Sequence, residues 1–139
     1  MLLSLVAAVL CVGVRCQESN ECSCIVVLEQ GGAEPLQLYK ESTSIVGSLC
    51  TDADFEFCSD FCNKEMTSFT KDLKEPLAPA NETLGQSLCN LAKKPVTGGL
   101  VKLAATVCDQ DAREIDLKQT QKLCCNKDVQ WEPCGGGNQ

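Results

Sequence analysis

The stretch CTDADFEFCSDFC, residues 50–62, is the most informative part of the sequence because it places cysteines within an amphipathic helical pattern. Apolar residues recur at intervals of three and four from residue 53 to about residue 74, and this period predicts one long helix. Cys58 and Cys62 are four residues apart in the chain. A helix therefore carries both on one face, roughly 6 Å apart along its axis.

A second cysteine pair has the spacing of a strand. The segment CSCIVVLEQ, residues 22–30, is rich in β-branched residues and predicts a strand. Cys22 and Cys24 then lie on one face, roughly 6.6 Å apart. The two separations match, so we expect two parallel disulfides to clamp the helix onto the strand, as in cysteine-stabilised αβ motifs. The spacing leaves open which cysteine of the strand pairs with which cysteine of the helix.

Other roles for the thiols fit the spacing poorly. Zinc sites favour Cys-x2-Cys pairs, and a thioredoxin-like redox site requires Cys-x-x-Cys, which the sequence lacks. Metallothionein-like clusters carry many Cys-x-Cys units, whereas only Cys22-Ser23-Cys24 has that spacing. We therefore expect structural disulfides and no metal.

The first residues, MLLSLVAAVLCVGVRCQ, resemble a secretory signal peptide covering residues 1–16. Val14 and Cys16 would occupy the −3 and −1 positions if cleavage falls before Gln17. A membrane anchor is the alternative, but the apolar run breaks at Arg15 and is too short to span a bilayer. We therefore expect a secreted, extracellular protein with no membrane span, whose residues 17–139 form a single cysteine-rich domain.

Signal cleavage leaves an even number of cysteines. Of the 12 cysteines in the chain, two lie within residues 1–16. The remaining disulfide candidates are Cys22, Cys24, Cys50, Cys58, Cys62, Cys89, Cys108, Cys124, Cys125 and Cys134. In a secreted chain this predicts five disulfides. Adjacent Cys124 and Cys125 point to opposite sides of a strand, so we expect them to have separate partners.

The rest of the pattern predicts an α+β fold, a small disulfide-rich domain with two helices packed on short antiparallel strands. The other expected elements are a strand at 36–40 pairing with 22–30, a capped helix from Thr83 to about Lys94, and a closing hairpin around 126–128. Residues 100–108 fit a strand better than a helix. Residues 75–83 are predicted to form a loop, and the pattern does not assign a secondary structure to residues 41–48 or 109–121. Thr51 or Asp52 is the expected N-cap of the first helix, and Thr83 with Gln86 forms a capping box at the second.

Charge and composition exclude several function classes. The formal net charge is −7, and the chain has no Lys/Arg cluster denser than Lys93-Lys94, which argues against binding nucleic acid or anionic membranes. Histidine is absent, so Ser-His-Asp and Cys-His nucleophiles are excluded. The stretch DQDARE, residues 109–114, begins like a calcium loop, but glycine is missing at its sixth position and Thr120 replaces the closing Glu. We expect no enzyme and no cofactor, and we interpret the acidic residues as solvated surface.

Two individual residues, Asn81 and Trp131, have predicted roles of their own. Asn81-Glu82-Thr83 is a glycosylation sequon in a proline-bounded loop, so Asn81 is the expected glycosylation site. Trp131 is the only tryptophan, and a plug of the core is the favoured interpretation over a binding anchor.

The order of the cysteines resembles the arthropod follicle cell protein family. The matching string is Cys22-x-Cys24, Cys50-x7-Cys58-x3-Cys62, then Cys89, Cys108, Cys124-Cys125 and Cys134. The resemblance implies secretion and an eggshell or extracellular-matrix setting, and it brings no catalytic residues. The chain has a single tyrosine, Tyr39, and no repeat, so we expect a discrete globular factor and not a cross-linked wall polymer.

The sequence therefore predicts a secreted, non-enzymatic, disulfide-stabilised monomer. It would be associated with an egg coat or matrix and act by binding an extracellular protein partner. The alternative is a soluble haemolymph factor of the cytokine or growth-factor kind. An enzyme and a protease inhibitor are further alternatives, for which no motif stands out.

Overall fold

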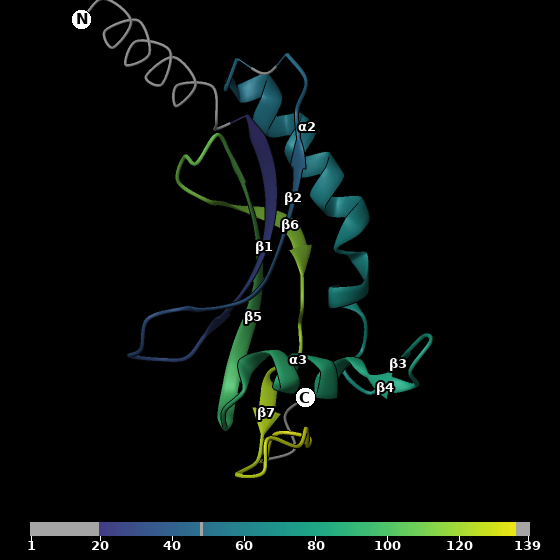
Figure 1. Cartoon of the computed structure of the whole chain (residues 1–139). Helices are drawn as coiled ribbons and strands as arrows, with labels where there is room; N and C mark the ends of the chain where they lie inside the picture. Colours follow the sequence, from purple (N-terminus) through teal and green to yellow (C-terminus); the bar gives the residue numbers. More distant parts are fainter. Residues whose placement is uncertain (1–19, 48, 136–139) are drawn as a thin grey trace, which may run out of the picture.

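The computed structural model describes residues 20–47 and 49–135. It confirms the α+β, disulfide-rich fold (Figure 1). The elements are β1 (Glu21–Glu29), β2 (Leu36–Ser44), α2 (Asp52–Glu65), the 3-10 helix η1 (Thr67–Thr70), β3 (Pro76–Leu77), β4 (Glu82–Thr83), α3 (Leu84–Ala92), β5 (Val96–Val107), β6 (Arg113–Lys118) and β7 (Leu123–Cys125). The signal peptide expected over residues 1–16 lies outside the described residues.

The long strand β5 organises an antiparallel sheet in the order β2-β1-β5-β6. Its residues 100–107 pair with β1, whereas its first residues pair with β7. The register shifts between Thr97 and Gly99, and the residue between them, Gly98, has a φ of +71° that favours glycine. One strand therefore joins the main sheet to the C-terminal segment.

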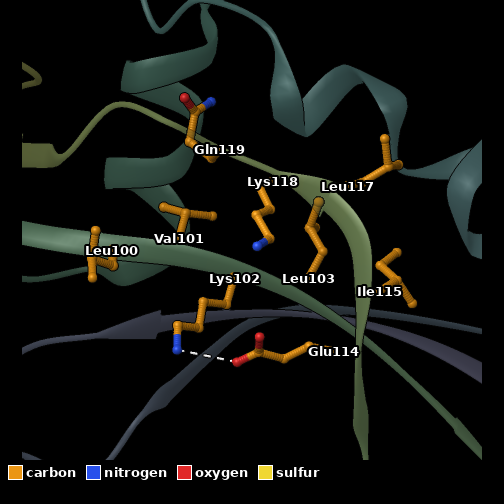
Figure 2. A pocket seen from close by; sticks show the side chains of 9 residues that line it. All are labelled: Leu100, Val101, Lys102, Leu103, Glu114, Ile115, Leu117, Lys118 and Gln119. Atoms are coloured by element: carbon orange, nitrogen blue, oxygen red, sulfur yellow. Dashed lines mark hydrogen bonds and ion pairs between the residues drawn. The ribbon is translucent and has the colours of Figure 1, made fainter.

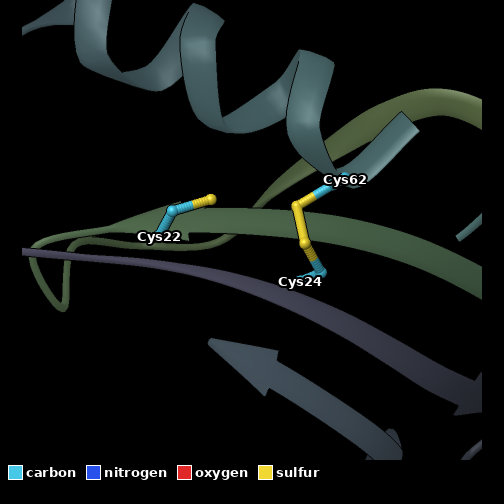
Figure 3. A group of neighbouring side chains, drawn as sticks. All are labelled: Cys22, Cys24 and Cys62. Carbon is cyan, nitrogen blue, oxygen red and sulfur yellow. A yellow bond between two sulfur atoms is a disulfide. The ribbon is translucent and has the colours of Figure 1, made fainter. Parts of the chain in front are cut away.

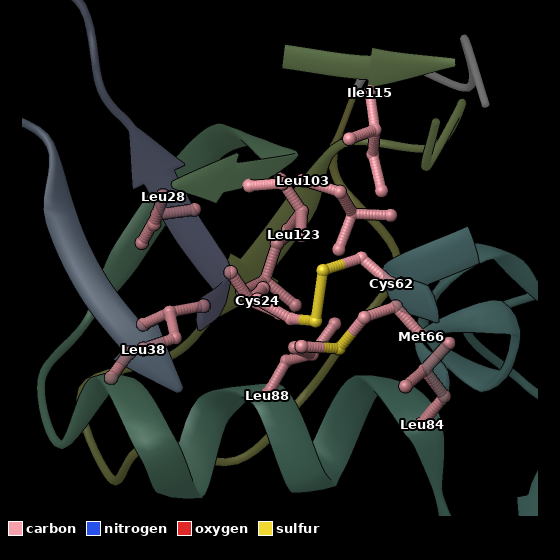
Figure 4. Packing of buried hydrophobic residues seen from close by; sticks show 14 of the residues in the cluster. Cys24, Leu28, Leu38, Cys62, Met66, Leu84, Leu88, Leu103, Ile115 and Leu123 are labelled. Carbon is pink, nitrogen blue, oxygen red and sulfur yellow. A yellow bond between two sulfur atoms is a disulfide. The ribbon is translucent and has the colours of Figure 1, made fainter. Parts of the chain in front are cut away.

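The helices lie on one face of this sheet (Figure 1). Cys22, Cys24, Val26 and Leu28 alternate along β1 and are fully buried beneath them. Figure 4 shows how leucines from both sides of the interface surround the Cys24–Cys62 disulfide. The core therefore lies between the inner face of the sheet and the two helices.

The predicted disulfide clamp is confirmed. Cys22 is bonded to Cys58 and Cys24 to Cys62, each with a Cα–Cα distance of 5.4 Å. The other disulfides are Cys50–Cys108, Cys89–Cys125 and Cys124–Cys134. Adjacent Cys124 and Cys125 do have separate partners, as expected. All ten cysteines beyond the expected signal peptide are therefore part of the scaffold.

The predicted helix over residues 53–74 was too long. Thr51 is the N-cap in a capping box with Asp54, but α2 ends at Glu65. Thr67 Oγ1 donates a hydrogen bond to the carbonyl of Asn63 at 2.7 Å, and Thr70 Oγ1 donates to that of Thr67 at 2.7 Å. These β-branched side chains bond to carbonyls at the end of the helix, and the chain there tightens into η1.

Three further segments differ from the sequence prediction. The expected loop at 75–83 contains the short β3–β4 hairpin, and the unassigned segment 109–121 contains β6. The expected helix from Thr83 to about Lys94 ends at Ala92, because Lys93 adopts a left-handed φ of 59°. The strands expected at 36–40 and 100–108 are confirmed, and the first continues to Ser44.

The second helix uses only half of the expected capping box. Thr83 Oγ1 accepts from the Gln86 N–H at 3.1 Å. The Gln86 side chain instead donates to the Val129 carbonyl at 3.0 Å and accepts from the Trp131 N–H at 2.8 Å. It thereby fastens the expected closing hairpin, in which Asn126 N–H bonds to the Gln130 carbonyl, onto α3.

Candidate functional site

A groove of about 500 Å³ lies where β2, the junction of α2 with η1, the β3–β4 hairpin and α3 meet. We call it the acidic groove. Its apolar lining consists of Tyr39, Phe69, Leu77, Leu84 and Leu91, and its polar lining of Glu41, Glu65, Ser68, Glu82, Ser87 and Asn90. Ligand pockets typically measure about 300–1,000 Å³ and combine apolar walls with a few polar groups. The acidic groove has both properties.

Strand β2 supplies one wall through its register with β1. Tyr39 pairs with Val26 and Glu41 pairs with Cys24, so both face the same side of the sheet as those buried residues. This is the side that the helices cover. Strand β2 is also at the edge of the sheet, so this wall of the groove is an outer strand.

The end of α2 supplies the second wall. Glu65 is the last residue of α2, and Phe69 lies in η1. The Tyr39 and Phe69 rings have centroids 5.6 Å apart and an interplanar angle of 38°, so they form a tilted aromatic pair. Phe69 in η1 therefore contacts Tyr39 in β2, and both rings line the groove.

The carboxylate of Glu82 is held in place by hydrogen bonds from α3. Glu82 Oε2 accepts from Ser87 Oγ at 3.3 Å, and Glu82 Oε1 accepts from Asn90 Nδ2. The start of α3 is itself tied down, since the Leu84 N–H donates to the Glu75 carbonyl at 2.9 Å. The position of Glu82 is therefore defined by hydrogen bonds as well as by its strand.

A disulfide links the end of α2 to β1, the strand that pairs with β2. The Cys24–Cys62 disulfide connects β1 to α2, one turn before Glu65. Cys24 pairs with Glu41 across the strands, so the disulfide lies next to both walls. A groove built on such a crosslink changes shape little, and a preformed site loses less conformational entropy when it binds.

The charge of the groove has one sign. Within the described part of the chain, its lining contains the carboxylates of Glu41, Glu65 and Glu82 and no lysine or arginine. Glu65 is exposed, and the other two side chains are half-buried. Carboxylates beside apolar walls attract a cation more strongly than they would in open water, because the walls lower the local dielectric constant.

A smaller hollow of about 240 Å³ lies between β5 and β6 (Figure 2). Its lining contains Lys102, Glu114 and Lys118, and Lys102 Nζ is 2.9 Å from Glu29 Oε2 and 3.1 Å from Glu114 Oε1. The hydrogen bond with Glu29, followed by that with Glu114, raises the pKa of Lys102 above its ordinary value of 10.5. This hollow is below the usual size of a ligand pocket, so the acidic groove is the better candidate.

Three cysteine sulfurs lie close enough together to resemble a metal site. The sulfurs of Cys22, Cys24 and Cys62 are within 4.8 Å of one another (Figure 3). Two neighbouring disulfides account for this proximity, because each of the three sulfurs is bonded to another sulfur. A disulfide sulfur is not a thiolate, and thiolates are what zinc binds.

The remaining residues singled out in the sequence lie outside the groove. Asn81 is exposed at the tip of the β3–β4 hairpin, where its N–H donates to the Leu77 carbonyl at 3.0 Å. Trp131 packs half-buried against the core, in agreement with a plug. The calcium-like stretch that begins at residue 109 runs into β6, Arg113–Lys118, so this segment does not adopt a calcium-loop conformation.

Sequence reasoning did not find the acidic groove. Its residues come from six elements, and each apolar member resembles an ordinary core position in its own segment. The only signal in the sequence was that Glu41, Glu65 and Glu82 each have apolar residues nearby in the chain. That signal is too common to single out a site.

Nothing matches this chain among protein-family models, curated proteins or solved structures. The resemblance to the arthropod follicle cell protein family stays a prediction. Among the described residues, no helix is both long and apolar enough to cross a membrane.

Proposed function

We propose that this chain is a secreted, non-enzymatic extracellular protein that acts by binding a partner protein at the acidic groove. The observation that carries the proposal is a preformed, ligand-sized groove beside the disulfide that links β1 to α2. Five disulfides are compatible with an extracellular location, where such bonds form and persist. The absence of histidine supports a binding role over catalysis.

The setting we propose is an egg coat or extracellular matrix, which rests on the cysteine order shared with the follicle cell family. The alternative is a circulating factor of the cytokine or growth-factor kind. Fractionation of ovary, egg coat and body fluid, with an antibody to the chain, separates the two. Retention in the egg coat supports the matrix role, whereas a monomer in body fluid that binds a saturable cell receptor supports the alternative.

The groove itself is tested with a matched pair of leucine variants. Leu91→Arg places a bulky cation in the acidic groove, whereas Leu100→Arg places one in the smaller hollow. We expect Leu91→Arg to abolish retention by the egg coat or receptor and Leu100→Arg to preserve it. Equal retention of both folded variants would overturn the groove as the binding site.

Secretion and glycosylation are tested by expressing the full chain in insect cells. We expect medium containing a protein that begins at Gln17, has no free thiol and carries an N-glycan on Asn81. Digestion with an N-glycosidase should lower its apparent mass, and Asn81→Gln should abolish that shift. Protein retained in the cell with residues 1–16 intact would contradict the signal-peptide prediction.

A further inference from the structure

The edge strand β2 and the acidic groove lie side by side, because Tyr39 and Glu41 belong to both. A strand at a sheet edge can pair with an extended segment of another protein, whose backbone then adds one more strand. Alternate side chains of such a segment point to the same side, as they do in any strand. The side facing the helices here is the side of the groove.

The two zones of the groove select different side chains. The tilted pair Tyr39–Phe69 and the leucines offer an apolar surface, whereas Glu41, Glu65 and Glu82 carry negative charge. An aromatic or aliphatic side chain fits the first zone. A lysine or arginine fits the second, where it also lies near aromatic rings that attract cations.

We propose that the acidic groove recognises an extended basic segment of the partner protein, in which an apolar residue and a lysine or arginine are two positions apart. The segment pairs with β2 and directs both side chains into the groove. This inference rests on the proposed binding function and names the chemistry of its partner.

The first measurement is calorimetric titration of the intact, disulfide-bonded protein with short capped peptides. The binding peptide carries phenylalanine and lysine two positions apart in a serine background. One control replaces lysine with norleucine, and a second places phenylalanine and lysine next to each other, on opposite faces of a strand. We expect only the first peptide to bind, and its affinity should fall as sodium chloride is raised.

Carboxylate variants provide the second measurement. Glu41→Gln and Glu65→Gln should each weaken binding of this peptide by about 1.5- to 5-fold, the range for partly exposed ion pairs. Glu56→Gln is the matched control, because Glu56 is exposed on the same helix as Glu65 but does not line the groove. Its affinity should equal that of the unaltered protein.

Each other outcome overturns part of the inference. Equal binding of the norleucine peptide would remove the requirement for a cation, and equal binding of the adjacent-residue peptide would remove the pairing with β2. Binding of phenethylammonium without any peptide would assign the groove to a small amine. If no probe binds, the inference fails, while retention of Leu100→Arg but not Leu91→Arg by the natural partner would still uphold the proposed function.

Discussion

The indole ring of Trp131 rests directly on the backbone of Gly85 in α3. A Cβ atom on Gly85 would lie 2.5 Å from Cδ1 and 2.5 Å from Cγ of that ring. The closing segment therefore requires glycine at this helical position, even though glycine is a poor helix former. Gln86 stabilises the same contact, because its Oε1 accepts from the backbone N–H of Trp131 at 2.8 Å.

Replacing Gly85 with alanine should displace the indole ring. We expect a loss of about 1–3 kcal/mol in the free energy of unfolding, since the clash outweighs the gain of up to ~1 kcal/mol in helix propensity. Trp131 is the only tryptophan, so a red shift of its emission would report its exposure directly.

Two comparisons isolate that clash. Gly31→Ala should leave stability and emission nearly unchanged, because a Cβ atom at Gly31 meets nothing within 4 Å. In the Trp131→Ala background, Gly85→Ala should cost less than it does alone, because the clashing ring is gone. Additive effects would show that the close approach has little energetic consequence.

Removing the clamp should destabilise the protein more than removing the last disulfide. Cys24 and Cys62 are 38 residues apart, whereas Cys124 and Cys134 are 10 apart. The chain-entropy estimate gives about 4 kcal/mol for the first loop, which opens only when Cys22–Cys58 and Cys24–Cys62 are both removed, and about 3 kcal/mol for the second. A variant with all four clamp cysteines replaced by alanine, compared by urea unfolding with the Cys124→Ala/Cys134→Ala variant, tests this order, and the buried site of Cys24 and Cys62 adds a cavity cost in the same direction. A larger loss at the terminal disulfide would contradict the assignment of the clamp as the main crosslink.

Gln119 should be a strong anchor for the turn after η1. Its Nε2 donates to the carbonyls of Phe69 at 2.9 Å and Lys71 at 2.8 Å, and its side chain is 6% exposed. Gln119→Leu leaves these carbonyls without that donor, so we expect a loss of about 2–3 kcal/mol in unfolding free energy and faster amide exchange in η1. Gln37→Leu, at an exposed position of β2, is the control and should change neither quantity. Unchanged exchange in Gln119→Leu would show that other contacts hold the turn.

The ion pairs of Lys102 predict a specific alkaline response. The pKa of Lys102 is raised above 10.5, so the folded state holds the proton more tightly than the unfolded chain. The resulting stability is fully present below that value and is lost as the pH rises through the higher pKa of the folded state. The stability difference between the unaltered protein and Lys102→Met should therefore be constant from about pH 7 to about pH 9 and shrink above pH 10.5. Salt should reduce this difference, since the side chain is partly exposed.

Lys40→Met, on exposed β2, corrects for the loss of one positive charge. A difference that grows with alkaline pH would have the wrong sign and would contradict the ion-pair assignment. Urea unfolding at a series of pH values measures both variants under the same conditions.

The clamp between strand and helix, the first helix cap and the long strand were predictable from the sequence. Two spacings, Cys22 to Cys24 in a strand and Cys58 to Cys62 in a helix, have nearly equal lengths, so local geometry predicts that the strand cysteines bond to the helix cysteines, but not which one bonds to which. The cap at Thr51 and the long strand ending near Cys108 also follow from local preferences. These features are predictable because neighbouring residues in the chain specify them.

The path of the chain after η1, the strand β6 and the acidic groove depend instead on tertiary contacts. The turn after η1 is tied to Gln119, about 50 residues farther along the chain. The groove joins Glu41, Glu65 and Glu82 from separate elements, and its aromatic pair brings Tyr39 of β2 to Phe69 of η1. Such contacts depend on how the elements pack and on the register of β2 against β1, which periodicity within a single segment does not contain.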